Sequence, residues 1–427
     1  MLDIKLIRKD PATIEKKLKT KDPKADLSLV LDLDKRLREM KTKVEQLKAS
    51  RNDYSQQIGE YKRTGKDASE ILKKVAEFAD ELHSIDQQIP PLEEQYTHAL
   101  ASLPNLPMDD IKVSPDKEDN VLVKEFGKKP EFDFAFKNHL ELNEKLHLFD
   151  FKRGAKLAGA GWPIYRGMGA RLEWALLNYM LETHLKNGFE QWMLPSTVRR
   201  EMMFASGQLP KFDNQQFKLK DDDFHLYLIP TAEVPLNALH VDEILSEDQL
   251  PLKYTAYTPC FRREAGAAGA NERGLIRTHQ FNKVEMFCFT KPEDSMAMFD
   301  TMLASAEEIL QGLGLHYRNM LLTTGDMSFA AARTVDIEVW LPGQNRYYEV
   351  SSVSNCTDYQ SRRSLIRYKN KEGKIELVHT LNGSGLATSR LMVGLLENNQ
   401  NADGSVNIPE VLQKFLGGIK KIEAKEI

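Results

Sequence analysis

Residues 261–285 read FRREAGAAGANERGLIRTHQFNKVE, the pattern of a strand, a glycine-bearing loop and a returning strand. Side chains two positions apart on a strand point to the same face of a sheet. We therefore expect one concave polar face lined by Arg262, Glu264, Phe281, Lys283 and Glu285. Cations, carboxylates and an aromatic ring in one place suit a nucleotide, although a hairpin with ordinary charged flanks has the same pattern.

This polar face gives each part of a nucleotide a partner. Arg262 suits a phosphate, Glu264 can accept from an exocyclic amine, and Phe281 can stack on a base. The chain contains neither a GxxxxGK[ST] loop nor a strand-GxGxxG-helix unit. A nucleotide site here is therefore of another design.

The segments around this hairpin predict an α+β domain. A helix is expected over residues 170–187, and strands over residues 192–195, 226–230, 254–262, 278–290, 334–340 and 347–353. Many short strands joined by turns favour a mostly antiparallel sheet flanked by helices. Residues 108–129, rich in acids and lysines, read as a linker, so this domain begins near residue 110.

The N-terminal region has the pattern of a coiled coil. Apolar positions alternate at spacings of four and three over residues 33–61, with Arg51 as the one charged member, and again over residues 71–96. Residues 63–66, RTGK, supply a helix stop between the two runs. The short connection predicts an antiparallel hairpin of two helices of about 30–35 residues, each on the order of 45–50 Å long.

Two local features bear on the second helix of this hairpin. Asp67 and Glu70 have the spacing of a capping box, which predicts that the helix starts at Asp67. Pro90 and Pro91 lie inside the second heptad run, where they remove backbone donors. We therefore expect a kink or break at this pair.

Charge is distributed unevenly along the hairpin. Residues 1–66 carry 18 Lys and Arg against 11 Asp and Glu, whereas residues 67–100 carry two lysines against eight acids. The basic limb could follow the phosphates of an RNA, although a solvated helix face often has this composition. Both interpretations stay open on charge alone.

Overall composition narrows the class of protein. The chain has 427 residues, 41% of them hydrophobic, and this length predicts two to three domains. Its net charge of -4 excludes a wholly basic protein that coats nucleic acid. Cys260, Cys288 and Cys356 are far apart and lack ligand spacing, so we expect neither a disulfide framework nor a zinc site. No secretory signal and no run of 18 apolar residues is present. We expect a soluble, cytoplasmic protein without a membrane partner.

Several segments together resemble one enzyme class. Residues 261–285 resemble motif 2 of the class II aminoacyl-tRNA synthetases, and residues 382–390, NGSGLATSR, resemble motif 3. Residues 231–233 (TAE), 336–340 (DIEVW) and 349–356 (EVSSVSNC) are similar to segments of the seryl-tRNA synthetase family, bacterial type. With the helical hairpin included, the resemblance covers essentially the whole chain in the same order.

The resemblance implies a domain organisation and partners. Residues 1–108 would form a tRNA-binding domain with the helical hairpin, and residues 109–427 a class II catalytic domain with motifs 1, 2 and 3. Motif 1 is marked only by the helix from Arg171 and by Pro195, and it implies a homodimer. The hairpin would rest on the long variable arm of serine tRNA, and on selenocysteine tRNA where that exists.

The resemblance also implies a reaction. Serine attacks the α-phosphorus of ATP to give seryl-adenylate and pyrophosphate, and the 3′-terminal ribose of the tRNA then takes the seryl group. Positioning and charge neutralisation can carry both steps without a covalent nucleophile. Arg262 and Arg390 are the implied catalytic residues, and Glu349 and Ser352 the implied oxygen ligands of Mg²⁺. Glu349 alone also fits a surface acid at a strand end.

The resemblance assigns two sets of binding residues. The implied serine-binding residues are Thr231, Ala232, Glu233, Glu285, Asn382 and Ser384. The implied ATP-binding residues are Arg262, Arg263, Glu264, Phe281, Glu349, Val350, Ser351, Ser352 and Arg390.

Within the serine set, the roles divide between the two ends of the amino acid. Thr231 and Glu233 would take the ammonium group, and Glu285 and Ser384 the hydroxyl. A pocket that binds the hydroxyl rejects alanine because its own polar groups are then left unpaired, whereas threonine must be excluded sterically. Read alone, residues 231–233 also fit a plain strand-to-helix cap.

Two other functions compete with this interpretation. A related ligase that loads a carrier protein would lack the long arm, and a non-catalytic RNA-binding paralogue would be expected to lose Arg262, Glu285 or Arg390. This chain departs from the family at Arg263, where serine is frequent, and we expect that side chain to point away from the Arg262 face. We interpret the neighbouring His279 as structural.

Overall fold

The computed structural model describes residues 1–220, 223–264 and 273–425. These form two compact units, one of Leu2–Lys19 with Pro23–Leu103, the other of Met1, Thr20–Asp22 and Pro104–Ile427. The glycine-bearing loop predicted around residues 265–272 lies outside the described residues. Within the described ranges, no helix is both long and apolar enough to cross a bilayer.

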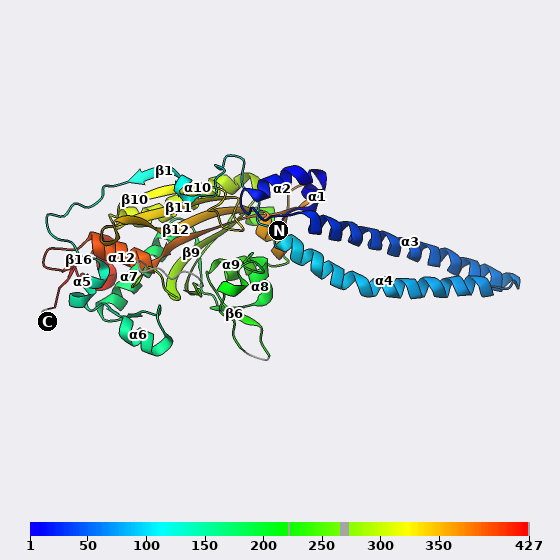
Figure 1. Cartoon of the computed structure of the whole chain (residues 1–427), viewed down its shortest axis with the longest axis horizontal. Helices are drawn as coiled ribbons and strands as arrows, with labels where there is room; N and C mark the ends of the chain where they lie inside the picture. Colours follow the sequence, from blue (N-terminus) through cyan, green and yellow to red (C-terminus); the bar gives the residue numbers. More distant parts are fainter. Residues whose placement is uncertain (221–222, 265–272, 426–427) are drawn as a thin grey trace. The chain divides into compact units, whose positions relative to one another are not determined.

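The first unit is built around two long helices that lie side by side as a hairpin (Figure 1). Its helices are α1 (Ile4–Lys9), α2 (Pro11–Lys19), α3 (Ser28–Thr64) and α4 (Ser69–Ala101). The predicted seam is buried in two clusters, which comprise Leu33, Leu37 and Leu92, and Val44, Leu47, Leu82 and Ile85. The prediction of a coiled-coil hairpin is confirmed.

The ends of the two helices follow from local sequence. Gly65 adopts φ 69°, which a residue with a side chain rarely adopts, and so ends α3. The predicted capping box is wrong, because α4 starts after Ala68 and no side chain caps it. Asp67 instead accepts the Ser69 N–H at 2.9 Å, an exposed turn that precedes the helix.

Of the kink or break expected at Pro90 and Pro91, the break is wrong. α4 runs through both prolines as one helix, and it curves without interruption in Figure 1. Ile85 and Leu92, on either side of the pair, are buried in the seam with α3. This packing offsets the backbone hydrogen bonds that the prolines remove.

The second unit is organised by an eight-stranded sheet with the strand order β1-β10-β11-β12-β15-β9-β8-β4. Every neighbouring pair is antiparallel except β4 and β8, so the expected α+β fold is confirmed. The strands are β1 (Val121–Phe126), β4 (Glu190–Trp192), β8 (Leu252–Phe261), β9 (Gln280–Thr290), β10 (Tyr317–Leu321), β11 (Arg333–Leu341), β12 (Arg346–Thr357) and β15 (His379–Ala387).

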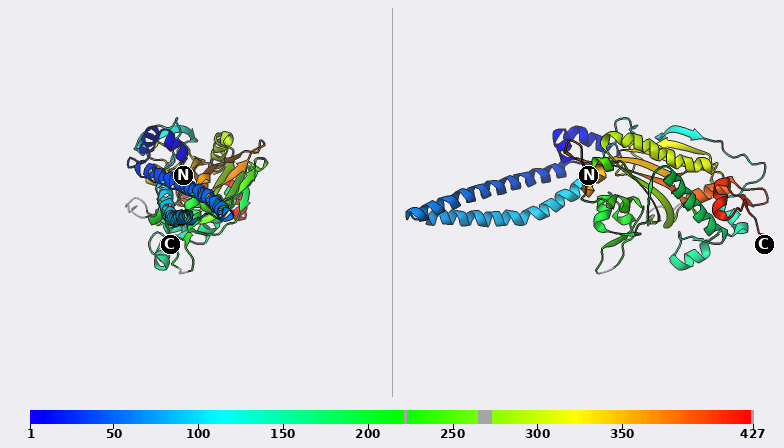
Figure 2. Two further views of the ribbon diagram at one scale, coloured as in Figure 1. Left: turned by 90° about the vertical axis from the view of Figure 1, so that its right-hand side faces the viewer. Right: turned by 180° about the vertical axis from the view of Figure 1, so that it is seen from behind.

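Helices flank this sheet, and α10 lies along it as the yellow-green helix of Figure 2. The helices are α5 (His139–Leu146), α6 (Phe151–Ala158), α7 (Met168–Lys186), α8 (Arg200–Ala205), α9 (Glu233–Ala238), α10 (Ser295–Gly312), α11 (Tyr359–Ser364), α12 (Thr388–Asn398) and α13 (Glu410–Gln413). Side chains of α7, α10 and α12 share the largest apolar core with the sheet.

In the described part of the unit, nine further short strands form small sheets. They are β2 (Phe149–Asp150) with β3 (Ile164–Tyr165), β5 (Thr197–Arg199) with β6 (Leu226–Leu228), β7 (Ile244–Ser246) with β13 (Arg367–Lys369) and β14 (Ile375–Leu377), and β16 (Val406–Asn407) with β17 (Lys421–Ile422).

Three strand predictions need correction. The segment predicted as a linker contains β1, an exposed edge strand that pairs with β10, a partner far away in sequence. The strand predicted over residues 226–230 is only three residues long and pairs with β5 outside the main sheet. β4 ends at Trp192, before Pro195, and contributes only a short parallel edge.

Candidate active site

Two adjoining cavities lie on one face of the main sheet. The larger, of about 510 Å³, and the smaller, of about 100 Å³, share part of their lining. The shared residues are Arg262, Glu264, Arg277, Lys283, Glu349 and Ser384. Both arginines singled out from the sequence reach this site, because Arg262 lines both cavities and Arg390 lines the smaller one.

The alternation of β9 places its polar side chains at the cavities. Val284 and Met286 point into the main apolar core, and Phe287 joins a second core with α9. Lys283 and Glu285 therefore lie on the face opposite that of Val284, and both line the larger cavity. This is the face that the period of two predicts.

One end of the larger cavity is a closed polar cluster. Lys283 donates to the Thr231 hydroxyl at 2.8 Å and forms an ion pair with Glu285. The Thr231 hydroxyl donates to Glu285 Oε2 at 3.1 Å and accepts the Glu233 N–H at 3.2 Å. All three side chains of the cluster are nearly inaccessible to solvent, so each is held in one orientation by the others.

A second carboxylate lies beside this cluster. Glu233, the first residue of α9, accepts from Gln360 Nε2 at 2.6 Å and from Asn382 Nδ2 at 3.1 Å through the same oxygen. Burial, and then the charge of Glu285, raises the pKa of Glu233 to about 7. Lys283 pairs with Glu285, whereas no side-chain cation is in hydrogen-bond contact with Glu233 among the described residues, so Glu233 is the carboxylate suited to an ammonium group.

The other end of the site is lined by arginines. The Arg262 guanidinium lies 5.2 Å from the centre of the Phe281 ring, a cation–π contact. Arg390, near the start of α12, donates to Glu349 O at 2.9 Å and to Ile276 O at 3.2 Å. Both guanidinium groups keep access to the small cavity, so an anion can reach them there.

Among the residues at the site that are absent from the sets predicted from the sequence are Arg277, Lys283 and Gln360. Arg277 pairs with Glu264 and lines both cavities, and it lies in the turn before β9, where strand periodicity gives no signal. Strand alternation places Lys283 on the polar face, but the resemblance assigns it no binding role. Gln360 lies on α11, in a segment with no motif of its own, so only the fold brings it to Glu233.

Strand irregularities explain why the residues from β12 reach the cavity. Glu349 pairs with Glu338 and Ser351 with Ile337, which leaves Val350 as an extra residue, a β-bulge. Glu349 and Ser352 both line the larger cavity as a result, although they are three positions apart.

The groups beside Glu349 fit a hard cation. Asp336 lies opposite Ser352, and burial, followed by the charge of Glu349, raises the pKa of Asp336 well above its ordinary value. Its Oδ1 is buried without a hydrogen-bond partner. In the part of the chain that the structure describes, no three His, Cys, Asp or Glu side chains could hold a metal ion together. An ion here therefore needs further oxygens from a ligand or from water.

Several residues predicted for the site do not line either cavity. Ala232 and Ser351 are fully buried, and Ser351 donates to the backbone oxygen of Ser384. Arg263 is exposed and its N–H donates to Gln215 O at 3.1 Å. The His279 ring lies against Trp162, with Nδ1 3.1 Å from Arg262 O, a contact in keeping with a structural role.

Comparisons with known proteins agree with this fold. Residues 217–399 match the tRNA synthetase class II core domain (G, H, P, S and T), and residues 1–107 match the seryl-tRNA synthetase N-terminal domain. A crystal structure of seryl-tRNA synthetase from Pyrococcus horikoshii complexed with ATP is similar with a TM-score of 0.93 and 35% identity over 100% of both chains. The fold and the core domain are those of a class II aminoacyl-tRNA synthetase.

Full-length relatives narrow the class to one family. The serine–tRNA ligase of Chlamydia pneumoniae is 54% identical over 100% of both chains. The cytoplasmic serine–tRNA ligase of Naegleria fowleri, in complex with AMP, has a TM-score of 0.88 and 29% identity over 100% of this chain and 99% of that one. The chain belongs to the seryl-tRNA synthetase family, and it is a ligase that joins serine to tRNA. The carrier-protein ligase and the non-catalytic paralogue are thereby set aside.

Proposed function

We propose that the two cavities bind serine and ATP side by side, so that the serine carboxylate can attack the α-phosphorus. Glu233 and Thr231 hold the ammonium group, and Glu285 with Ser384 holds the hydroxyl. Arg262, which lines both cavities, bridges the serine carboxylate and the α-phosphate. The products are seryl-adenylate and pyrophosphate.

The nucleotide occupies the arginine end. Arg390 binds the γ-phosphate, Phe281 stacks on the adenine, and Glu264 accepts from the exocyclic amine while Arg277 holds its carboxylate. Val350 contributes apolar contact in the small cavity. One observation carries this arrangement: the two cavities share Arg262 in their lining, so an amino acid held beside Glu233 and Glu285 adjoins a phosphate held by Arg277 and Arg390.

The same site would hold Mg²⁺ through Glu349 and Ser352. The ion would neutralise phosphate charge as the pyrophosphate departs. Glu349 and Ser352 offer oxygen donors, and Asp336, whose Oδ1 is buried without a hydrogen-bond partner, lies opposite Ser352. Loss of pyrophosphate exchange in EDTA, and its return with added Mg²⁺, is expected.

The second step transfers the seryl group to the 3′ end of serine tRNA, which the helical hairpin binds at the long variable arm. Exposed cations on α3 support this role: Lys48, Arg51, Lys62 and Arg63. We extend the proposal to selenocysteine tRNA and to a cytoplasmic location. Charging of each purified tRNA, with and without the hairpin, checks the partner assignment.

A homodimer is part of the same proposal. Apolar side chains on and near α7 are exposed, with Trp174 at 56% and Met193 at 97% of full accessibility, which is unusual for groups of this size unless a partner covers them. A sedimentation mass of a single 48.8 kDa chain would contradict the dimer.

Replacing Glu285 should affect serine far more than ATP. Glu285→Gln is expected to raise the KM for serine about 10- to 100-fold, because a hydrogen bond to a charged group contributes about 1.5–3 kcal/mol. The KM for ATP should change less than about threefold. Pyrophosphate exchange at varied serine and varied ATP measures both constants.

The pairing with Lys283 needs a control, since Glu285→Gln leaves a buried ammonium without its partner. The double variant Lys283→Met with Glu285→Gln removes both charges together. If the double variant recovers folding stability but keeps the high KM for serine, the contact with serine is separated from the ion pair. Equal rises in both KM values would refute the role of Glu285.

Serine binding should weaken below neutral pH. Only the ionised Glu233 attracts an ammonium group, and its pKa in the free protein is raised to about 7. The KM for serine is therefore expected to rise as pH falls from 8 to 6, approaching about tenfold per unit below the pKa. Glu233→Gln keeps an acceptor for Gln360 and Asn382, and should show a high KM that no longer depends on pH over this range.

A further inference from the structure

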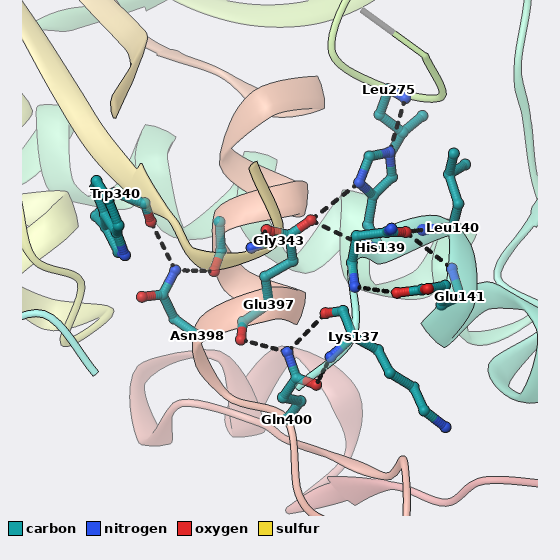
Figure 3. A network of polar contacts seen from close by, with 12 residues as sticks. Lys137, His139, Leu140, Glu141, Leu275, Trp340, Gly343, Glu397, Asn398 and Gln400 are labelled. Carbon is teal, nitrogen blue, oxygen red and sulfur yellow. Dashed lines mark hydrogen bonds and ion pairs between the residues drawn. The ribbon is translucent and has the colours of Figure 1, made fainter. Parts of the chain in front are cut away.

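A buried histidine–glutamate pair lies outside the motifs. His139, the first residue of α5, and Glu397, near the end of α12, are 1% and 0% exposed (Figure 3). Neither residue lines the two cavities of the active site. A buried polar pair of this kind needs each of its hydrogen bonds satisfied, so its partners show what it holds in place.

The partners fix which ring nitrogen carries the hydrogen. Glu397 Oε1 accepts the His139 N–H at 2.9 Å and lies 3.1 Å from His139 Nδ1, while Oε2 accepts the Gly343 N–H at 2.9 Å. A carboxylate only accepts, so Nδ1 is the donor. The opposite nitrogen, Nε2, then accepts the Leu275 N–H at 3.4 Å, as Figure 3 shows.

Leu275 belongs to the turn that leads into β9. The next residue, Ile276, accepts from Arg390 Nε at 3.2 Å through its backbone oxygen, and the one after it, Arg277, pairs with Glu264. The three consecutive residues 275–277 therefore connect the histidine ring to two guanidinium groups of the site, those of Arg390 and Arg277. Arg277 and Arg390 both line the small cavity.

Backbone geometry shows how closely the turn approaches the ring. Gly274 has φ 70°, and a Cβ at this position would overlap His139 Nε2 and crowd Leu140. Only glycine fits both the conformation and the contact. On the other side of the ring, Glu397 is on α12, the helix that carries Arg390 near its first turn.

We propose that His139, oriented by Glu397, is a positioning residue for nucleotide binding: its Nε2 holds residues 274–277 so that Arg277 and Arg390 face the phosphates. This inference rests on the proposed function, in which the small cavity takes ATP. It concerns the free energy of ATP binding and leaves the serine end, at Thr231 and Glu285, unaffected.

Two substitutions separate the two hydrogen bonds of the ring. His139→Asn places its amide where Nδ1 lies, so it can still donate to Glu397 but cannot reach Leu275. His139→Gln places its amide oxygen where Nε2 lies, so it can still accept from Leu275. We expect His139→Asn to raise the KM for ATP about tenfold with the KM for serine within about twofold, and His139→Gln to restore the ATP value to within about threefold.

The melting temperature and an arginine variant complete the test. A role in stability alone predicts that both variants lower Tm and leave the KM for ATP unchanged, which would overturn the proposal. Equal rises in the two KM values would also overturn it. Arg390→Gln, measured in parallel, should raise the KM for ATP; if it does not, the proposed function fails rather than the positioning role.

A second variant keeps the proposal testable should the His139 variants not fold. Glu397→Gln retains an acceptor for the Gly343 N–H, but its NH2 group then faces the His139 N–H and Nδ1, so the ring loses the acceptor that fixes its tautomer and orientation. The same selective rise in the KM for ATP is expected, and its absence in a folded Glu397→Gln protein would count against the proposal.

Discussion

Arg262→Ala is expected to lower serine-dependent exchange of pyrophosphate into ATP about 10²- to 10³-fold, the usual loss when one preorganised donor to a developing charge is removed. The Arg262 guanidinium lines both cavities, where the serine carboxylate and the α-phosphate would otherwise repel each other. Its contact with Phe281 holds the group over the site before substrates arrive. Steady-state exchange rates at saturating serine and ATP give the comparison.

Two further variants show whether charge or geometry is responsible. Arg262→Lys should recover little activity, because an ammonium group cannot make the two parallel hydrogen bonds of a guanidinium. Arg367→Ala removes a guanidinium that pairs with Asp242 away from both cavities, and should leave exchange unchanged. Full activity in Arg262→Ala would remove the basis of the proposed chemistry.

Shortening the helical hairpin should abolish transfer to tRNA while amino-acid activation continues. Replacing residues 43–86 with a short glycine-rich turn removes the outer parts of α3 and α4 and keeps the inner cluster of Leu33, Leu37 and Leu92. The apolar core of the catalytic unit contains no residue of the hairpin. Exchange is therefore expected within about twofold of the intact protein, with tRNA charging reduced by several orders of magnitude as phosphate contacts are lost.

A matched control variant distinguishes the effect of the hairpin's length from the effect of its positive charge. Replacing Lys48, Arg51, Lys62 and Arg63 with glutamine keeps the helices and removes the exposed cations of the limb. This variant should charge tRNA poorly at moderate salt and better at low salt, since counterion release then favours the remaining contacts. Loss of both exchange and charging in the shortened protein would contradict the division of labour between the two units.

Strand periodicity predicts much of the site. The alternation of β9 correctly groups Lys283 with Glu285, because the opposite face of the strand is apolar and must be buried. The coiled-coil seam can be predicted for the same reason, because the residues at heptad spacing are those that must be buried between the two helices.

Other features depend on the assembled fold. The bulge at Val350 breaks the period of two, and so the sequence pattern alone cannot place Glu349 and Ser352 on one side. The sequence pattern does not predict β1, because an exposed edge strand needs no apolar face. His139 and Gln360 reach their partners from segments far away in sequence, where no local pattern marks them.

Pyrophosphate exchange measured with each of the twenty amino acids tests the central claim most directly. Serine alone should support rapid exchange. Alanine should be rejected about 10⁴-fold, because the groups that bind the hydroxyl would be left unpaired, and threonine about 10- to 200-fold by the size of the pocket. Exchange with alanine at a rate comparable to that with serine, or with another amino acid in place of serine, would contradict a pocket in which Glu285 selects the hydroxyl beside bound ATP.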